Sequence, residues 1–109
     1  MTQTKMQDFI DEAVRRIVDQ FHPERIILFG SCARGTSAYN SDIDVLVVMP
    51  VEGSHRKKAS EIDLALADRT VPMDIIVVTP EQFNRQHDMI GTVVHEAAQE
   101  GKVLYERAA

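Results

Sequence analysis

The stretch RIILFGSCARGTSAYNSDIDVLVV, residues 25–48, decides the fold, because it holds two apolar runs separated by a polar segment. The first run, RIILF at 25–29, ends at Gly30, and the second, DIDVLVVM at 42–49, ends at Pro50. Short apolar runs bounded by turn residues are typical of buried strands. The pattern therefore predicts two strands. Between them, residues 31–34 favour one helical turn and residues 36–41 have turn chemistry.

The segments before and after these two strands have the apolar spacing of helices. Apolar residues recur at helical spacing over 4–20, over 55–68 and from Ile90 to Ala98. A third apolar run, MDIIVV at 73–78, again ends at a proline, while 81–86 favour a helical turn and 102–105 a short edge strand. Helices alternating with apolar strands predict an α/β or α+β fold around a small sheet. The 109 residues fit a single domain spanning 1–109.

Composition narrows the class of protein. The one cysteine, Cys32, excludes an internal disulfide framework, and the longest apolar run, residues 45–49, is far shorter than the roughly 18 residues of a membrane span. The net charge of −5 argues against direct DNA binding but permits a nucleotide carried with Mg²⁺. A basic run, HRKK at 55–58, is typical of a solvated helix face, with contact to a triphosphate or an RNA-bearing partner as the alternative. We expect a cytoplasmic protein.

Three aspartates form the candidate site. Asp42 and Asp44 lie two apart on a strand, so both carboxylates point to one face, with Cα atoms about 6.6 Å apart. Asp74 opens another apolar strand. If these strands are neighbours, the three carboxylates converge and repel one another unless basic partners or metal ions compensate them. Ion pairs with Arg34, Arg69 or a lysine and a metal site both remain open.

Gly30-Ser31 follows the first strand directly and precedes the predicted helical turn. Backbone N–H groups at such a junction can bind phosphate oxygens, a serine hydroxyl adds a donor, and glycine permits close approach of the ligand. An ordinary turn and helix cap explains the same residues when they are taken alone.

Together these residues resemble a known family. Gly30-Ser31, ten intervening residues and Asp42-Ile43-Asp44 resemble the GSx10DxD signature of the DNA polymerase β-like nucleotidyltransferase superfamily. The string at 30–48 is similar to the GSxARGxxxxxSDxDLxV form of minimal nucleotidyltransferases, and MDIIVV at 73–78 to the strand with that family's third carboxylate. The resemblance covers residues 25–78. It implies the family's fold, a small mixed β-sheet flanked by helices.

The resemblance also implies a role for each matching position. By position, Asp42 and Asp44 hold two divalent metal ions, Asp74 is the third ligand and the candidate base, Gly30 and Ser31 bind phosphate, and Arg34 either contacts phosphate or pairs with a carboxylate. An all-oxygen ligand set suits Mg²⁺ or Mn²⁺. Two such ions support in-line attack on the α-phosphorus of a nucleoside triphosphate.

The implied partner is a small helical HEPN-domain toxin, with this chain as the antitoxin that transfers AMP from ATP to a tyrosine of the toxin. A single small domain leaves no room for an acceptor domain, so we expect the acceptor from a partner chain or a second copy, in a hetero-oligomer or homodimer. Three alternatives remain: an antitoxin acting by occlusion, a nucleotidyltransferase acting on a small molecule or RNA, and a structural or regulatory domain with ion-paired aspartates.

Overall fold

The computed structural model describes residues 3–30, 43–68 and 73–107, with side chains from residue 7 onward. The elements in chain order are α1 (Gln3–Phe21), β1 (Arg25–Phe29), β2 (Ile43–Val48), α3 (His55–Ala65), β3 (Met73–Val78), α4 (Pro80–Gln86), α5 (Val93–Glu100) and β4 (Lys102–Glu106). The helical turn predicted at 31–34 and the turns at 36–41 lie outside the described residues, as do Ser31, Cys32, Arg34, Asp42 and Arg69.

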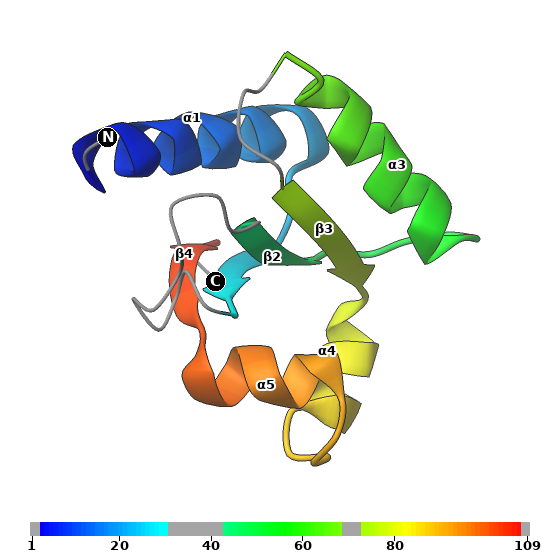
Figure 1. Ribbon diagram of the computed structural model, residues 1–109. Coiled ribbons are helices and arrows are strands. Elements are labelled where there is room, and N and C mark those ends of the chain that lie inside the picture. Colours follow the sequence, from blue (N-terminus) through cyan, green and yellow to red (C-terminus); the bar gives the residue numbers. More distant parts are fainter. Residues whose placement is uncertain (1–2, 31–42, 69–72, 108–109) are drawn as a thin grey trace.

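The strands form one mixed sheet in the order β3-β2-β1-β4 (Figure 1). β1 pairs with β2 and with β4 in antiparallel fashion, whereas β2 and β3 are parallel. Parallel neighbours need a crossover connection, and α3 supplies it. The predicted α+β fold with a small mixed sheet is therefore confirmed.

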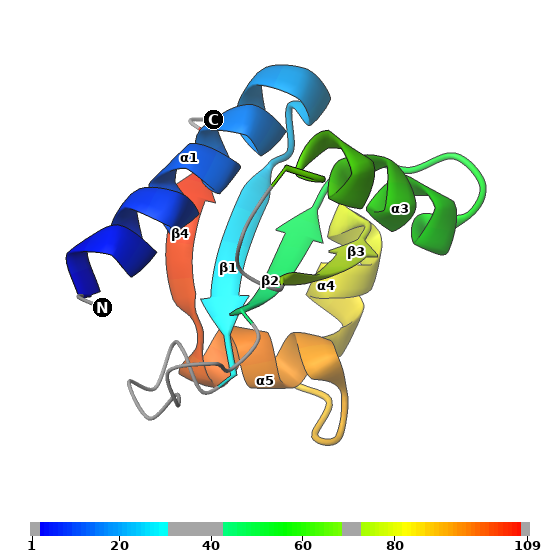
Figure 2. The same cartoon turned by 45° about the horizontal axis from the view of Figure 1, so that its top comes forward.

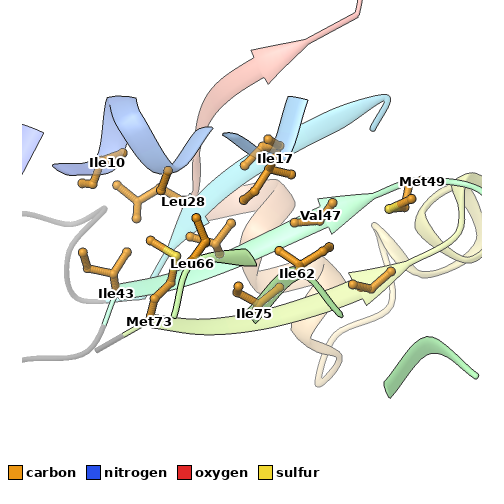
Figure 3. Packing of buried hydrophobic residues seen from close by; sticks show 14 residues of the cluster. Ile10, Ile17, Leu28, Ile43, Val47, Met49, Ile62, Leu66, Met73 and Ile75 are labelled. Carbon is orange, nitrogen blue, oxygen red and sulfur yellow. The ribbon is translucent and has the colours of Figure 1, made fainter. Parts of the chain in front are cut away.

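Helices cover both faces of the sheet, α1 and α3 on one and α4 and α5 on the other (Figure 2). Side chains alternate along each strand, so each face has its own apolar cluster. On β2, Ile43, Val45 and Val47 belong to the cluster under α1 and α3, shown in Figure 3, whereas Leu46 and Val48 belong to the cluster under α4 and α5. This alternation determines the face to which Asp44 points.

Two helix boundaries differ from the prediction by three residues. α3 ends at Ala65, three residues early, and the N–H of Leu66 donates to the carbonyls of Asp63 and Leu64. The prediction that the last helix begins at Ile90 is wrong: α5 begins at Val93, and Ile90 is 88% exposed. Periodicity misplaced this start because Gly91, at φ +97°, breaks the helical path.

Residues at the ends of α5, α4 and β4 explain where these elements begin and end. The hydroxyl of Thr92 accepts a hydrogen bond from the His95 N–H at 3.0 Å, which makes Thr92 the N-cap of α5. The helical turn predicted at 81–86 is a seven-residue helix, α4, with Thr79 as its N-cap and Pro80 in its first turn. The predicted edge strand at 102–105 is confirmed and extends to Glu106.

An ion pair joins α1 to the segment that follows α3, in the layer formed by these two helices. Arg16 of α1 lies 2.6 Å from Asp68, just after α3. The hydrogen bond from Arg16, together with its positive charge, lowers the pKa of the Asp68 carboxyl below its ordinary value.

None of the helices in the described ranges is long and apolar enough to cross a bilayer.

Gly101 joins α5 to β4 at a crowded position, and Gly101→Ala tests that packing. Its φ of −79° suits any residue, but a Cβ there would overlap the carbonyl oxygen of Ala97 and lie 2.5 Å from Cγ2 of Ile27. Overpacking of this kind typically costs about 1–3 kcal/mol. We expect Gly101→Ala to lower the free energy of unfolding by that amount in urea titrations. An unchanged midpoint would contradict the tight contact.

Candidate active site

Two of the three predicted carboxylates lie side by side. Asp44 on β2 is the register partner of Asp74 on β3, and Phe29 on β1 is the partner of Asp44 on the other side. Neighbouring strands are about 4.8 Å apart, so the three side chains form one row across the sheet. The condition on which the convergence of the carboxylates depended, that the two aspartate strands are neighbours, is therefore met for Asp44 and Asp74.

The row lies on the face covered by α4 and α5. The residues flanking Asp44, Ile43 and Val45, face the other way into the cluster under α1 and α3, so Asp44 points away from that cluster. The same alternation holds around Asp74 on β3. Phe29 belongs to the apolar cluster under α4 and α5, which identifies the face of the row.

The two carboxylates differ in exposure. Asp44 is half-buried and Asp74 is exposed, while Phe29 beside them is buried. Carboxylates at this separation repel each other, and a divalent cation bound by both relieves the repulsion. Paired carboxylate oxygens are the donors that Mg²⁺ and Mn²⁺ prefer, so this part of the predicted ligand set fits such an ion.

The described ranges hold only part of the predicted ligand set. Within residues 3–30, 43–68 and 73–107, no three histidine, cysteine, aspartate or glutamate side chains gather at a position for a metal ion. Asp42, the remaining predicted ligand, lies outside those ranges, so its assignment stays a prediction.

Gly30 lies next to the half-buried carboxylate. It follows β1 directly, is buried and has φ +77°, in the left-handed region that favours glycine. A Cβ built on Gly30 would lie 2.5 Å from Oδ2 of Asp44. Sequence reasoning considered Gly30 as a phosphate contact or as part of an ordinary turn, whereas the structure places it against a carboxylate. The other two predicted phosphate contacts, Ser31 and Arg34, lie outside the described residues.

Sequence reasoning gave no part in this face to α5. Val94 and Ala97 of α5 belong to the same buried cluster as Phe29 and Leu46, so α5 helps to form the wall beside the carboxylate row. The helical periodicity around Val94 indicated a buried stripe, but a stripe does not specify which face of a sheet it covers.

The hollow of about 500 Å³ lined by Arg25 and Phe83 lies at the opposite end of the sheet from the carboxylates. The Arg25 guanidinium lies 5.0 Å from the ring centre of Phe83 and 2.9 Å from Glu106. Arg107 donates to the carbonyl of His22 at 2.6 Å. These contacts attach α4 and the end of β4 to the region where β1 begins, which is a structural role.

The basic run at 55–58 lies on α3, in the layer on the other side of the sheet from the carboxylates. Lys58 donates to Glu61 at 3.0 Å and lies 5.8 Å from the ring centre of Phe21. The N–H of Lys57 donates to the Ser54 hydroxyl, which caps the helix. These contacts favour a structural, solvated helix face over a triphosphate contact.

The mixed sheet, the glycine turn and the paired strand carboxylates together are typical of an enzyme that transfers nucleotides. Residues 10–104 match the family model for the nucleotidyltransferase domain, so the chain belongs to this family and is a nucleotidyltransferase. Over 86 residues it is 38% identical to a candidate protein adenylyltransferase from Methanocaldococcus jannaschii, an alignment that covers 75% of this chain and 78% of the relative.

Solved structures share the fold. A candidate nucleotidyltransferase from Sulfolobus solfataricus superposes with a TM-score of 0.69 at 22% identity, over 96% of this chain and 84% of the other. A chain from a toxin–antitoxin structure with AMP-PNP superposes with a TM-score of 0.55 at 21% identity, over 89% of this chain and 73% of the other. At sequence identities this low, the structural similarity supports a conclusion about the fold alone.

Proposed function

We propose that the protein transfers AMP from ATP to a hydroxyl group of a partner protein, a tyrosine of a small helical HEPN-type toxin, and thereby acts as its antitoxin. The observation that carries the transfer chemistry is the placement of Asp44 beside Asp74, with Gly30 adjoining Asp44. Carboxylates paired on neighbouring strands next to a glycine turn can hold a cation beside a bound triphosphate.

The acceptor class rests on the relatives and on the sequence motif. The Methanocaldococcus relative is named as an adenylyltransferase of proteins, and one structural neighbour comes from a toxin–antitoxin system with an ATP analogue. The motif at 30–48 resembles that of minimal nucleotidyltransferases, which implies a HEPN toxin as partner.

Members of the nucleotidyltransferase family generally use divalent metal ions. Here Asp44 and Asp74, joined by Asp42, would hold Mg²⁺, two ions in the full site, with Mn²⁺ as a substitute. When bound, the ions lower the pKa of the attacking hydroxyl and neutralise charge on the leaving pyrophosphate.

The chain's own groups account for orientation and for the proton. The N–H groups after β1, at Gly30 and Ser31, would donate to phosphate oxygens and align the α-phosphorus for attack. Asp74 is exposed, so an acceptor hydroxyl can approach its carboxylate and transfer a proton to it. A bond forms between the acceptor oxygen and the α-phosphorus while the bond to pyrophosphate breaks.

ATP binding should depend on the metal. Without a divalent cation, the triphosphate meets two carboxylates of like charge, so we expect ATP affinity to fall at least about tenfold in excess chelator, about 1.4 kcal/mol. Titration calorimetry with ATP, with and without Mg²⁺, measures this. Asp8→Asn serves as a control, because it removes an exposed carboxylate on α1, across the sheet from the site. It should show the same dependence on Mg²⁺ as wild type. Equal affinity with and without Mg²⁺ would contradict the metal site.

The acceptor is tested by intact-mass spectrometry. The protein encoded beside this chain is incubated with it, Mg²⁺ and each nucleoside triphosphate in turn. We expect the partner to gain the mass of one or more AMP groups with ATP, and fragmentation to locate them on tyrosine. No mass change, together with transfer to RNA or a small molecule, would assign a different acceptor.

A further inference from the structure

The four glycines in the described residues differ in what surrounds the missing side chain. Gly53 and Gly91 have φ of +92° and +97°, and a Cβ on either would have no atom of the described part of the chain within 4 Å, its chain neighbours aside. Gly30 has a similar φ, +77°, but its Cβ would lie 2.5 Å from Oδ2 of Asp44. Gly30 is therefore needed both for its backbone conformation and for the space it leaves to one carboxylate oxygen.

Among the described residues beyond its chain neighbours, the conflict at Gly30 involves that oxygen alone. Cγ and Cβ of Asp44 would lie at 3.4 and 3.5 Å from the added Cβ, which are ordinary contact distances. The backbone of Asp44 is held by pairing with Phe29 on one side and Asp74 on the other. A side chain at position 30 would therefore be accommodated mainly by rotation of the Asp44 carboxylate, by roughly an ångström at Oδ2.

We propose that Gly30 is a positioning residue for Asp44: the absence of a side chain at position 30 leaves the space in which the Asp44 carboxylate lies ready to bind a cation. The steric relation stands on the geometry alone, and its consequence for cation binding rests on the proposed function. A role in phosphate binding acts only when nucleotide is present. The positioning role, in contrast, affects metal binding even when no nucleotide is present.

The first test is structural and needs no metal. In a crystal structure of Gly30→Ala, we expect Oδ2 of Asp44 to be displaced by about an ångström relative to wild type, with the backbone of β1 and β2 unchanged. An unmoved carboxylate, with the strain taken up by the backbone at position 30, would overturn the proposal.

The second test measures Mn²⁺ binding without nucleotide, by electron paramagnetic resonance. Disturbing a group that orients a metal ligand typically weakens metal affinity about 10- to 100-fold, and we expect this loss in Gly30→Ala. Gly91→Ala is the matched control, because it places a Cβ on a residue of similarly positive φ with no clash among the described residues, and it should keep wild-type affinity. In an Asp44→Ala background, Gly30→Ala should cause no further loss.

The outcomes separate the two proposals. A displaced carboxylate with unchanged Mn²⁺ affinity would overturn the positioning role, whereas wild-type protein that binds no Mn²⁺ would count against the proposed metal site and leave the steric relation intact. If Gly30→Ala fails to fold, Gly30→Ala/Asp44→Ala should fold, because the clashing oxygen is gone. A double variant that also fails to fold, when Gly91→Ala folds with a similar backbone strain, would overturn the steric relation.

Discussion

We expect Asp74→Asn to lower the rate of the proposed AMP transfer at least about 10²-fold while the protein stays folded. Asparagine is nearly isosteric with aspartate, but its amide cannot accept the proton of the acceptor hydroxyl and is a weaker ligand for a divalent cation. General-base catalysis typically contributes 10²–10⁴-fold, so the loss should reach at least the lower end of that range. Single-turnover rates at saturating ATP and acceptor measure the chemical step.

The exposure of Asp74 makes this variant a clean one. Asp74 is exposed near the start of β3, and substitutions of exposed residues usually change the free energy of unfolding by less than about 0.5 kcal/mol. A large drop in rate with unchanged stability therefore reports on chemistry. Asp8→Asn, an exposed aspartate across the sheet, should transfer AMP at the wild-type rate. If Asp74→Asn also does so, Asp74 plays no part as the base.

Three strands, β1, β2 and β3, were predictable from the sequence because each is an apolar run with a glycine or a proline within two residues of its end. The pairing of β2 with β3, which brings Asp44 beside Asp74, followed only conditionally, since periodicity identifies strands and does not specify their neighbours. The start of α5 was misplaced because Ile90 continues the apolar spacing across Gly91, where φ of +97° interrupts the helix.

The close approach of Gly30 to the Asp44 carboxylate could not be predicted from the sequence around either residue. Fourteen positions separate the two residues in the chain, and only the antiparallel pairing of β1 with β2 brings the end of one strand beside the start of the other. The motif suggested a ligand for the glycine turn, because glycine after a strand commonly allows close approach of phosphate. That the same glycine leaves room for a carboxylate required the register.

The double variant Asp42→Ala/Asp44→Ala should bind the partner as wild type does and fail to modify it. Removing two of the three predicted carboxylates removes most of the negative charge that holds the cation, and metal ions typically contribute several kcal/mol to the transition state, equivalent to about 10³-fold or more in rate. We expect the partner to co-purify with the variant at unchanged mass. Because Asp44 is half-buried, urea unfolding must first show that the variant is folded.

Co-expression in cells with the proposed toxin partner then decides whether its neutralisation needs AMP transfer. Each AMP adds a bulky anion, which would repel RNA phosphates from a nuclease site on the partner, so modification can inhibit the toxin after the two chains separate. Occlusion requires the antitoxin to remain bound. We expect wild type to restore growth at amounts well below those of the toxin, and Asp42→Ala/Asp44→Ala to give no protection even in excess. Equal protection by the double variant would show that binding alone neutralises the toxin and that the carboxylate row is dispensable for this role.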